Sequence, residues 1–114
     1  MKRNIKFKAK KLNSCEWVEG DLVHIGNRVC IGGDHLKDGI TDVDPSTVCM
    51  FTGLTGKNGA PIYEGDIVMH KDNNAERRGD INWDSKAAAF CFGQDFLVHY
   101  HSEDMVVVGN KFDK

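Results

Sequence analysis

Short β-rich runs separated by turn residues constrain this chain more than any other feature of its sequence. In the C-terminal half, four such runs follow one another at short intervals, at residues 79–83, 88–92, 96–100 and 105–108. No stretch sustains the i, i+3, i+4, i+7 apolar spacing of a long amphipathic helix. Regular short strands favour a small barrel or sandwich over a helical bundle, so we predict a mainly β fold with little helix.

The N-terminal half continues this pattern with a strand and a hairpin. Residues 5–9 alternate strictly between apolar and polar side chains, which predicts a strand with lysines on its solvent face. Residues 15–25 and 28–31 are two further extended runs. The Gly26-Asn27 dipeptide between them is typical of a tight turn. We therefore expect these two runs to pair as a hairpin.

Basic residues are concentrated at the start of the chain, where no acidic residue occurs before Glu16. They are Lys2, Arg3, Lys6, Lys8, Lys10 and Lys11. The favoured interpretation is a solvated edge strand, because lysines on an exposed strand discourage pairing with another chain. Nucleic-acid contact is the alternative.

Two polar stretches are expected to be loops. Residues 32–44 hold several Asp and Gly residues and only scattered apolar ones, and Asp44-Pro45-Ser46 predicts a closing turn. Residues 72–78, with the sequence DNNAERR, are the most polar run of the chain.

The bulk composition describes an ordinary globular chain. Its 114 residues match one domain, and 40% hydrophobic with 28% charged residues allow both a core and solubility. No apolar run approaches the roughly 18 residues of a membrane span, and the start lacks a secretory signal, so we expect a cytoplasmic location without membrane contact. The net charge of −2 argues against binding nucleic acid by global electrostatics.

The four cysteines show neither zinc-type nor redox-motif spacing. Cys15, Cys30, Cys49 and Cys91 lie far apart in the sequence. We interpret them as free thiols that are packed as small hydrophobic side chains.

Several ordered blocks carry a family resemblance. Residues 43–68 read VDPSTVCMFTGLTGKNGAPIYEGDIV, and VVVGN follows at residues 106–110. Together with the opening strand and residues 17–21, these blocks closely resemble the signature of the YopX family. Met50 and Gly56 depart from the pattern, at positions where Gln and Asp are common.

The resemblance implies a mainly β fold with an SH3-like barrel element and an origin in bacteriophage or prophage genomes. It implies no agreed activity. We expect one YopX-like domain over residues 1–114, with an N-terminal β subdomain at 1–45 and a barrel-like part at 46–114 as the alternative division.

The residue types in the signature are suited to ending strands and forming turns. Thr52, Gly53 and Leu54 can end a strand with a hydroxyl, a flexible glycine and a leucine that returns to the core. Glycines supply the left-handed conformations that tight turns and bends require. We assign a structural role to Thr52, Gly53, Leu54, Asn58, Gly59, Gly65, Gly109 and Asn110.

Two sets of polar residues are candidate ligand sites. Tyr63, Glu64 and Asp66 place two carboxyl groups close together, a pattern that can bind cations or move protons, although such groups also act as turn acceptors. His99 and His101 would share one face of a strand and could bind a metal, but no third ligand is identifiable. Plain turn residues and surface histidines are the favoured interpretations, and we predict no metal and no cofactor.

A nucleic-acid surface is a further candidate. Arg77, Arg78 and Trp83 lie near Phe90 and Phe92 in the sequence, and small barrels bind single strands by stacking bases on aromatics beside basic residues. Most of these aromatics are expected in the core instead.

No nucleophile elbow, phosphate loop or dinucleotide fingerprint occurs, so we predict that the chain is not an enzyme. Our first hypothesis is an accessory protein of phage or prophage origin that acts through a protein partner or by self-association. The alternative is a small β-barrel that binds nucleic acid.

Overall fold

The computed structural model describes residues 6–36, 39–71 and 75–113. Within these ranges the chain is mainly β, as predicted, and its helical structure is confined to three 3-10 turns. None of these turns has the length and apolar character that a membrane crossing needs. The SH3-like barrel element stays a prediction.

Eleven strands are present in the described ranges. They are β1 (Phe7–Lys10), β2 (Trp17–Ile25), β3 (Arg28–Gly32), β4 (Ile40–Asp42), β5 (Cys49–Thr55), β6 (Pro61–Tyr63), β7 (Asp66–Lys71), β8 (Glu76–Asp84), β9 (Ala89–Phe92), β10 (Asp95–Phe96) and β11 (Met105–Asn110). The chain forms two compact units, an N-terminal unit (Met1–Phe51) and a C-terminal unit (Thr52–Lys114).

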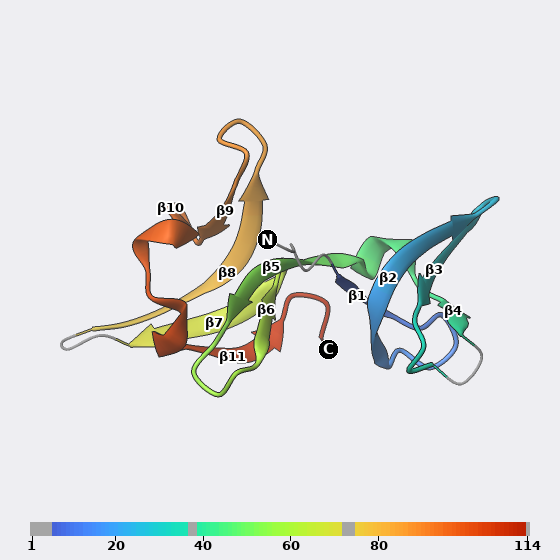
Figure 1. Cartoon of the computed structure of the whole chain (residues 1–114). Coiled ribbons are helices and arrows are strands. Elements are labelled where there is room, and N and C mark those ends of the chain that lie inside the picture. Colours follow the sequence, from blue (N-terminus) through green and yellow to red (C-terminus); the bar gives the residue numbers. More distant parts are fainter. Residues whose placement is uncertain (1–5, 37–38, 72–74, 114) are drawn as a thin grey trace. The chain divides into compact units, whose positions relative to one another are not determined.

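The N-terminal unit contains the strand order β4-β3-β2-β1-β5. Its predicted hairpin is confirmed: Ile25 pairs with Arg28, and Gly26 has a φ of +59° in the turn. Figure 1 shows β2 and β3 as a long twisted hairpin. The core of this unit consists of Ala9, Val18, Ile31 and Val43.

The edge-strand interpretation of β1 is wrong. Phe7 pairs with Gly20 of β2 on one side and with Met50 of β5 on the other, so β1 is an internal strand. Its lysines therefore do not protect an open edge. Lys2 and Arg3 lie outside the described residues.

The expectation of a loop over 32–44 is wrong in part. Ile40–Asp42 forms β4 and pairs with β3, and Asp42 also forms a 2.7 Å ion pair with Arg28. The predicted turn at Asp44 is confirmed: its carboxyl group accepts a hydrogen bond from the backbone N–H of Ser46 at 3.0 Å and begins a 3-10 turn.

The C-terminal unit contains the sheet order β10-β9-β8-β7-β11, and the second half of β5 lies beside β6. Figure 1 shows β8 as a long curved strand beside β7. This strand starts earlier than predicted: Arg77 and Arg78 belong to β8 and pair with His70 and Met69 of β7, so the loop expected at 72–78 is wrong for these residues.

Residues 96–100 do not form a continuous strand. The chain leaves β10 after Phe96 and forms a 3-10 turn at Leu97–His99, in which the backbone N–H of Tyr100 donates to the Leu97 carbonyl oxygen at 3.0 Å. The apolar run predicted an extended strand, but Leu97 instead turns into the core and is buried.

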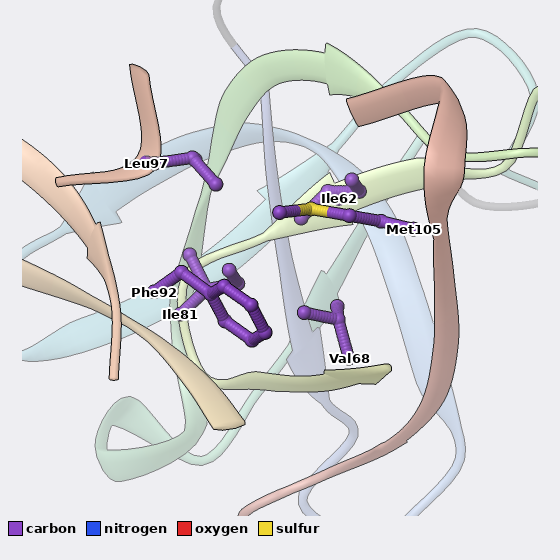
Figure 2. Packing of buried hydrophobic residues seen from close by; sticks show 6 residues of the cluster. All are labelled: Ile62, Val68, Ile81, Phe92, Leu97 and Met105. Atoms are coloured by element: carbon purple, nitrogen blue, oxygen red, sulfur yellow. The ribbon is translucent and has the colours of Figure 1, made fainter. Parts of the chain in front are cut away.

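The core of the C-terminal unit collects one apolar side chain from each of several elements. Figure 2 shows the Phe92 ring lying toward Val68, with the Met105 and Ile62 side chains alongside one another. Each such residue contributes about 1.5–3 kcal/mol when it is fully buried. The cluster consists of Ile62, Val68, Ile81, Phe92, Leu97 and Met105.

All four cysteines are free thiols, as predicted. Cys30, Cys49 and Cys91 are buried, but Cys15 is exposed, so its expected packing is wrong. The Cys30 thiol donates a hydrogen bond to Asp42 at 3.0 Å, and this bond together with burial raises the pKa of Cys30.

Candidate functional site

Two separate blocks of the sequence signature, residues 43–68 and 106–110, meet inside the C-terminal unit. Asp66 is 0% exposed, and its Oδ1 accepts a 2.9 Å hydrogen bond from the side-chain amide of Asn110. Its Oδ2 accepts a 2.8 Å bond from the backbone N–H of Tyr63. Both carboxyl oxygens of Asp66 therefore bind protein donors, which favours a structural role over metal or ligand binding.

The turn between β6 and β7 extends this network. Gly65 has a φ of +90°, a conformation that favours glycine, and its N–H donates to the Ile81 carbonyl oxygen. The Gly65 carbonyl oxygen accepts from the N–H of Lys111 at 2.9 Å. Tyr63 is buried and Glu64 is half-buried at this turn. The signature thus links the β6–β7 turn to the end of β11, where Gly109 precedes Asn110.

The remaining signature residues also shape the backbone. The Thr52 hydroxyl donates to the Ile62 carbonyl oxygen at 2.8 Å and accepts from the Leu54 N–H at 3.2 Å. Gly53 has a φ of +89°, and Leu54 packs against the core cluster. In the Asn58-Gly59 turn, Gly59 has a φ of +77° and its N–H donates to the Gly56 carbonyl oxygen at 3.0 Å.

An apolar groove lies elsewhere in the same unit, where the 3-10 turns face β5 and β9. Its volume is about 370 Å³, within the usual range of ligand pockets of about 300–1,000 Å³. Leu54, Phe90 and Leu97 supply apolar walls, and Val98 at the opening is 83% exposed. The other lining residues are Thr52, Ala89, Tyr100, His101, Ser102 and Glu103.

One wall of the groove is held by three polar side chains. The Arg77 guanidinium donates to Asp95 at 2.7 Å and to the Tyr100 hydroxyl oxygen at 2.6 Å, while the Tyr100 hydroxyl donates to Asp95 at 2.7 Å. These bonds fix the position of Tyr100, whose ring also contacts Phe92 edge-on at 5.0 Å.

The same triad changes two pKa values. The Tyr100 hydroxyl and then the Arg77 guanidinium lower the pKa of Asp95 by hydrogen bonding to its charged form. The bond to Asp95 raises the pKa of Tyr100. A lowered folded-state pKa means that the contribution of Asp95 to stability is present above its unfolded-state pKa. That contribution is lost as the pH falls through the folded-state pKa.

Arg77, Arg78 and Trp83 do not form a single surface. Arg77 is engaged with Asp95, and its guanidinium lies over the Phe92 and Tyr100 rings. Arg78 projects from the opposite face of β8, because successive side chains alternate along a strand. Trp83 is 47% exposed and contacts Phe90 edge-on at 5.0 Å, while Phe92 is in the core as predicted.

His99 and His101 are both exposed, as the favoured interpretation expected, but the shared strand face considered for metal binding is not formed. His99 ends a 3-10 turn and contacts the Phe96 ring, while His101 lies beyond the turn with its Nδ1 3.6 Å from Glu103, so they do not share a strand face. In the part of the chain that the structure describes, no three His, Cys, Asp or Glu side chains are grouped to hold a metal.

The sequence was compared with models of known protein families. The family model described as YopX protein matches residues 5–114. The chain belongs to the YopX family. No curated protein matches it.

For this YopX family member, the match covers both the signature blocks and the groove. Sequence reasoning identified the signature but missed the groove residues Leu97, Val98 and Glu103. They belong to residues 97–103, where the apolar pattern predicted a strand through residue 100. No residue in this segment indicated the two 3-10 turns.

We predict that replacing the Asp66 carboxylate, which accepts from Asn110 and from Tyr63, destabilises the C-terminal unit. Asp66→Asn replaces one acceptor oxygen of the carboxylate with an amide donor. Either the Asn110 amide or the Tyr63 N–H then loses its acceptor, at a cost of about 1–3 kcal/mol. Urea unfolding followed by Trp83 fluorescence in a Trp17→Phe background measures the change. Asp104→Asn, at an exposed position, is the matched control. Equal stability of the two variants would contradict a stabilising role for the hydrogen bonds of Asp66.

We also predict that Tyr100→Phe raises the pKa of Asp95 toward its ordinary value, because the variant lacks the hydroxyl that donates to the carboxylate. Carboxyl ¹³C NMR titration measures it. The pKa of Asp44, which Ser46 lowers in the N-terminal unit, is the internal control. An unchanged Asp95 titration would show that Arg77 alone sets the pKa of Asp95.

Proposed function

We propose that this YopX family member is a non-catalytic accessory protein, of phage or prophage origin, that acts in the bacterial cytoplasm by binding a protein partner or a second copy of itself. The groove of the C-terminal unit supports this proposal most directly. It combines an apolar lining with a valine that is 83% exposed.

Exposed apolar side chains near the groove add to the argument. Trp83 and Phe96 are 47% and 39% exposed, and both are large aromatics of the kind that is enriched in protein interfaces. A soluble domain gains nothing for its own stability from leaving such groups in water, and exposed apolar surface often marks an interaction site. Family membership supports the phage or prophage origin, which the resemblance implies.

We predict that Val98→Lys abolishes partner recovery or self-association, because it puts a charge at the apolar opening without touching the core. The tagged chain is used for pull-down from bacterial lysate with and without nuclease, and for sedimentation velocity alone. Val106→Lys, at a 40% exposed valine on β11 that does not line the groove, is the control. The proposal would be refuted if the unmodified chain recovered no nuclease-resistant partner and did not self-associate.

Nucleic-acid binding is the second candidate, and the lysines of β1 favour it. Lys6 Nζ lies 4.9 Å from the Phe51 ring centroid, and Lys8 and Lys10 Nζ lie 4.8 and 5.5 Å from that of Trp17. Strand alternation puts the three cations on one face of the N-terminal unit. Because lysines cover these rings, the geometry suits phosphate contact better than base stacking.

This candidate ranks second because acidic residues lie close to the lysines at the start of the chain. Glu19 is the cross-strand partner of Lys8, and Lys11 forms a 3.9 Å ion pair with Glu16. Acidic neighbours reduce the positive potential that attracts a phosphate backbone.

If the lysines of β1 bind phosphates, replacing Lys6, Lys8 and Lys10 together by Gln reduces the slope of log affinity against log salt. The expected loss is about 0.7 per phosphate contact for a single strand, or about 2 for three contacts. Fluorescence anisotropy with a labelled oligothymidylate measures the slope. Replacing Lys57, Lys71 and Lys111 by Gln removes the same charge elsewhere, and absence of binding even at low salt would exclude this function.

A further inference from the structure

The charge around the groove indicates which partner it accepts. Glu103 lines the groove with a side chain that is 73% exposed, and exposed Asp104 follows it. Over residues 52–114 the sequence has seven Lys and Arg against ten Asp and Glu, a net charge of −3. The groove therefore lies on an acidic unit and has an acidic rim.

The arginine that holds one wall of the groove does not offset this charge. The Arg77 guanidinium is paired with Asp95 at 2.7 Å and lies over two aromatic rings. His101 lies beside Glu103, at 3.6 Å between Nδ1 and Oε1, but its side chain is 81% exposed and so this contact is solvated. An approaching ligand meets the negative rim and not the arginine.

The shape of the groove limits what can enter. Its volume of about 370 Å³ is near the lower end for small-molecule pockets, which gives room for one large side chain and the adjoining backbone. Leu97 is 4% exposed and forms the closed part of the groove, while Leu54 and Phe90 are half-buried. Apolar contact is therefore available inside, and charged contact only at the rim.

The walls are already in place before any partner binds. The Arg77–Asp95–Tyr100 bonds hold one wall. Two backbone bonds close the successive 3-10 turns, from the Tyr100 N–H to the Leu97 carbonyl oxygen and from the Asp104 N–H to the His101 carbonyl oxygen, each at 3.0 Å. A preorganised groove loses little conformational entropy on binding, which lowers the cost of binding a ligand.

We propose that the groove binds an extended protein segment in which one large apolar side chain is flanked by lysine or arginine. The apolar side chain enters between Leu54, Phe90 and Leu97, and the basic neighbours meet Glu103 and Asp104. This inference rests on the proposed function and specifies the partner class of the same groove.

Synthetic fluorescein-labelled heptapeptides test the proposal with the full chain. The probe has a central phenylalanine with two lysines on each side, and two comparison peptides carry alanine at the centre or glutamates in place of the lysines. We expect the probe to bind at least about tenfold more tightly than either comparison peptide by fluorescence anisotropy. Amide NMR shifts should concentrate at residues 97–103.

Charge reversal at the rim provides the matched variants. Glu103→Lys should weaken binding of the probe by about tenfold or more, because it turns an attraction into a repulsion. Val106→Lys places the same side chain outside the groove and should change binding by less than about twofold. Circular dichroism confirms the fold of both variants, and unchanged affinity in a folded Glu103→Lys variant would overturn the proposal.

The remaining outcomes separate the two levels of inference. Equal binding of the lysine and glutamate peptides with shifts in the groove would overturn the basic partner class and leave the docking groove of the proposed function intact. Groove shifts with a small apolar compound such as toluene, but with no peptide, would overturn the inference in favour of a small-molecule pocket. No binding of any probe, together with full partner recovery by Val98→Lys, would overturn both.

Discussion

The carboxyl group of Asp66 is completely buried, and the C-terminal unit is organised around satisfying it. Burial of such a group without partners is costly, so each of its oxygens requires a donor. Asn110 supplies one from β11, and the Tyr63 backbone supplies the other from β6. One side chain thereby joins the β6–β7 turn to a strand 44 positions further along the chain. This contact joins the two signature blocks physically.

With those strands joined, the unit can hold a groove on its other elements. Ile62, Val68 and Met105 come from the strands that the network connects, and they pack with Phe92 and Leu97. Leu97 belongs to both the core and the groove, so its packing in the core holds the 3-10 turn in position. Arg77, Asp95 and Tyr100 hold the same turn from the side. The groove is therefore built on rigid neighbours, as a binding site requires.

The sequence predicted the parts of this structure that depend on local chemistry. Glycine at the Gly26, Gly59 and Gly65 turns and alternation in β1 were sufficient to place turns and strands, because backbone conformation and side-chain period are local properties. It was less successful where pairing decides the outcome. Arg77 and Arg78 are in a polar run, yet β7 recruits them into β8. The β1 lysines resemble edge protection, yet β2 and β5 cover both sides.

By itself, the sequence determined a mainly β chain of the YopX family, with turns at its glycines and with apolar residues destined for a core. Only the tertiary structure decided that Asp66 binds Asn110, that Leu97 turns inward while Val98 stays in water, and that Glu103 lies at the mouth of an apolar groove. These contacts join residues that are distant along the chain or that leave a strand at an unmarked point. The burial and hydrogen bonding that stabilise them exist only after the elements have packed.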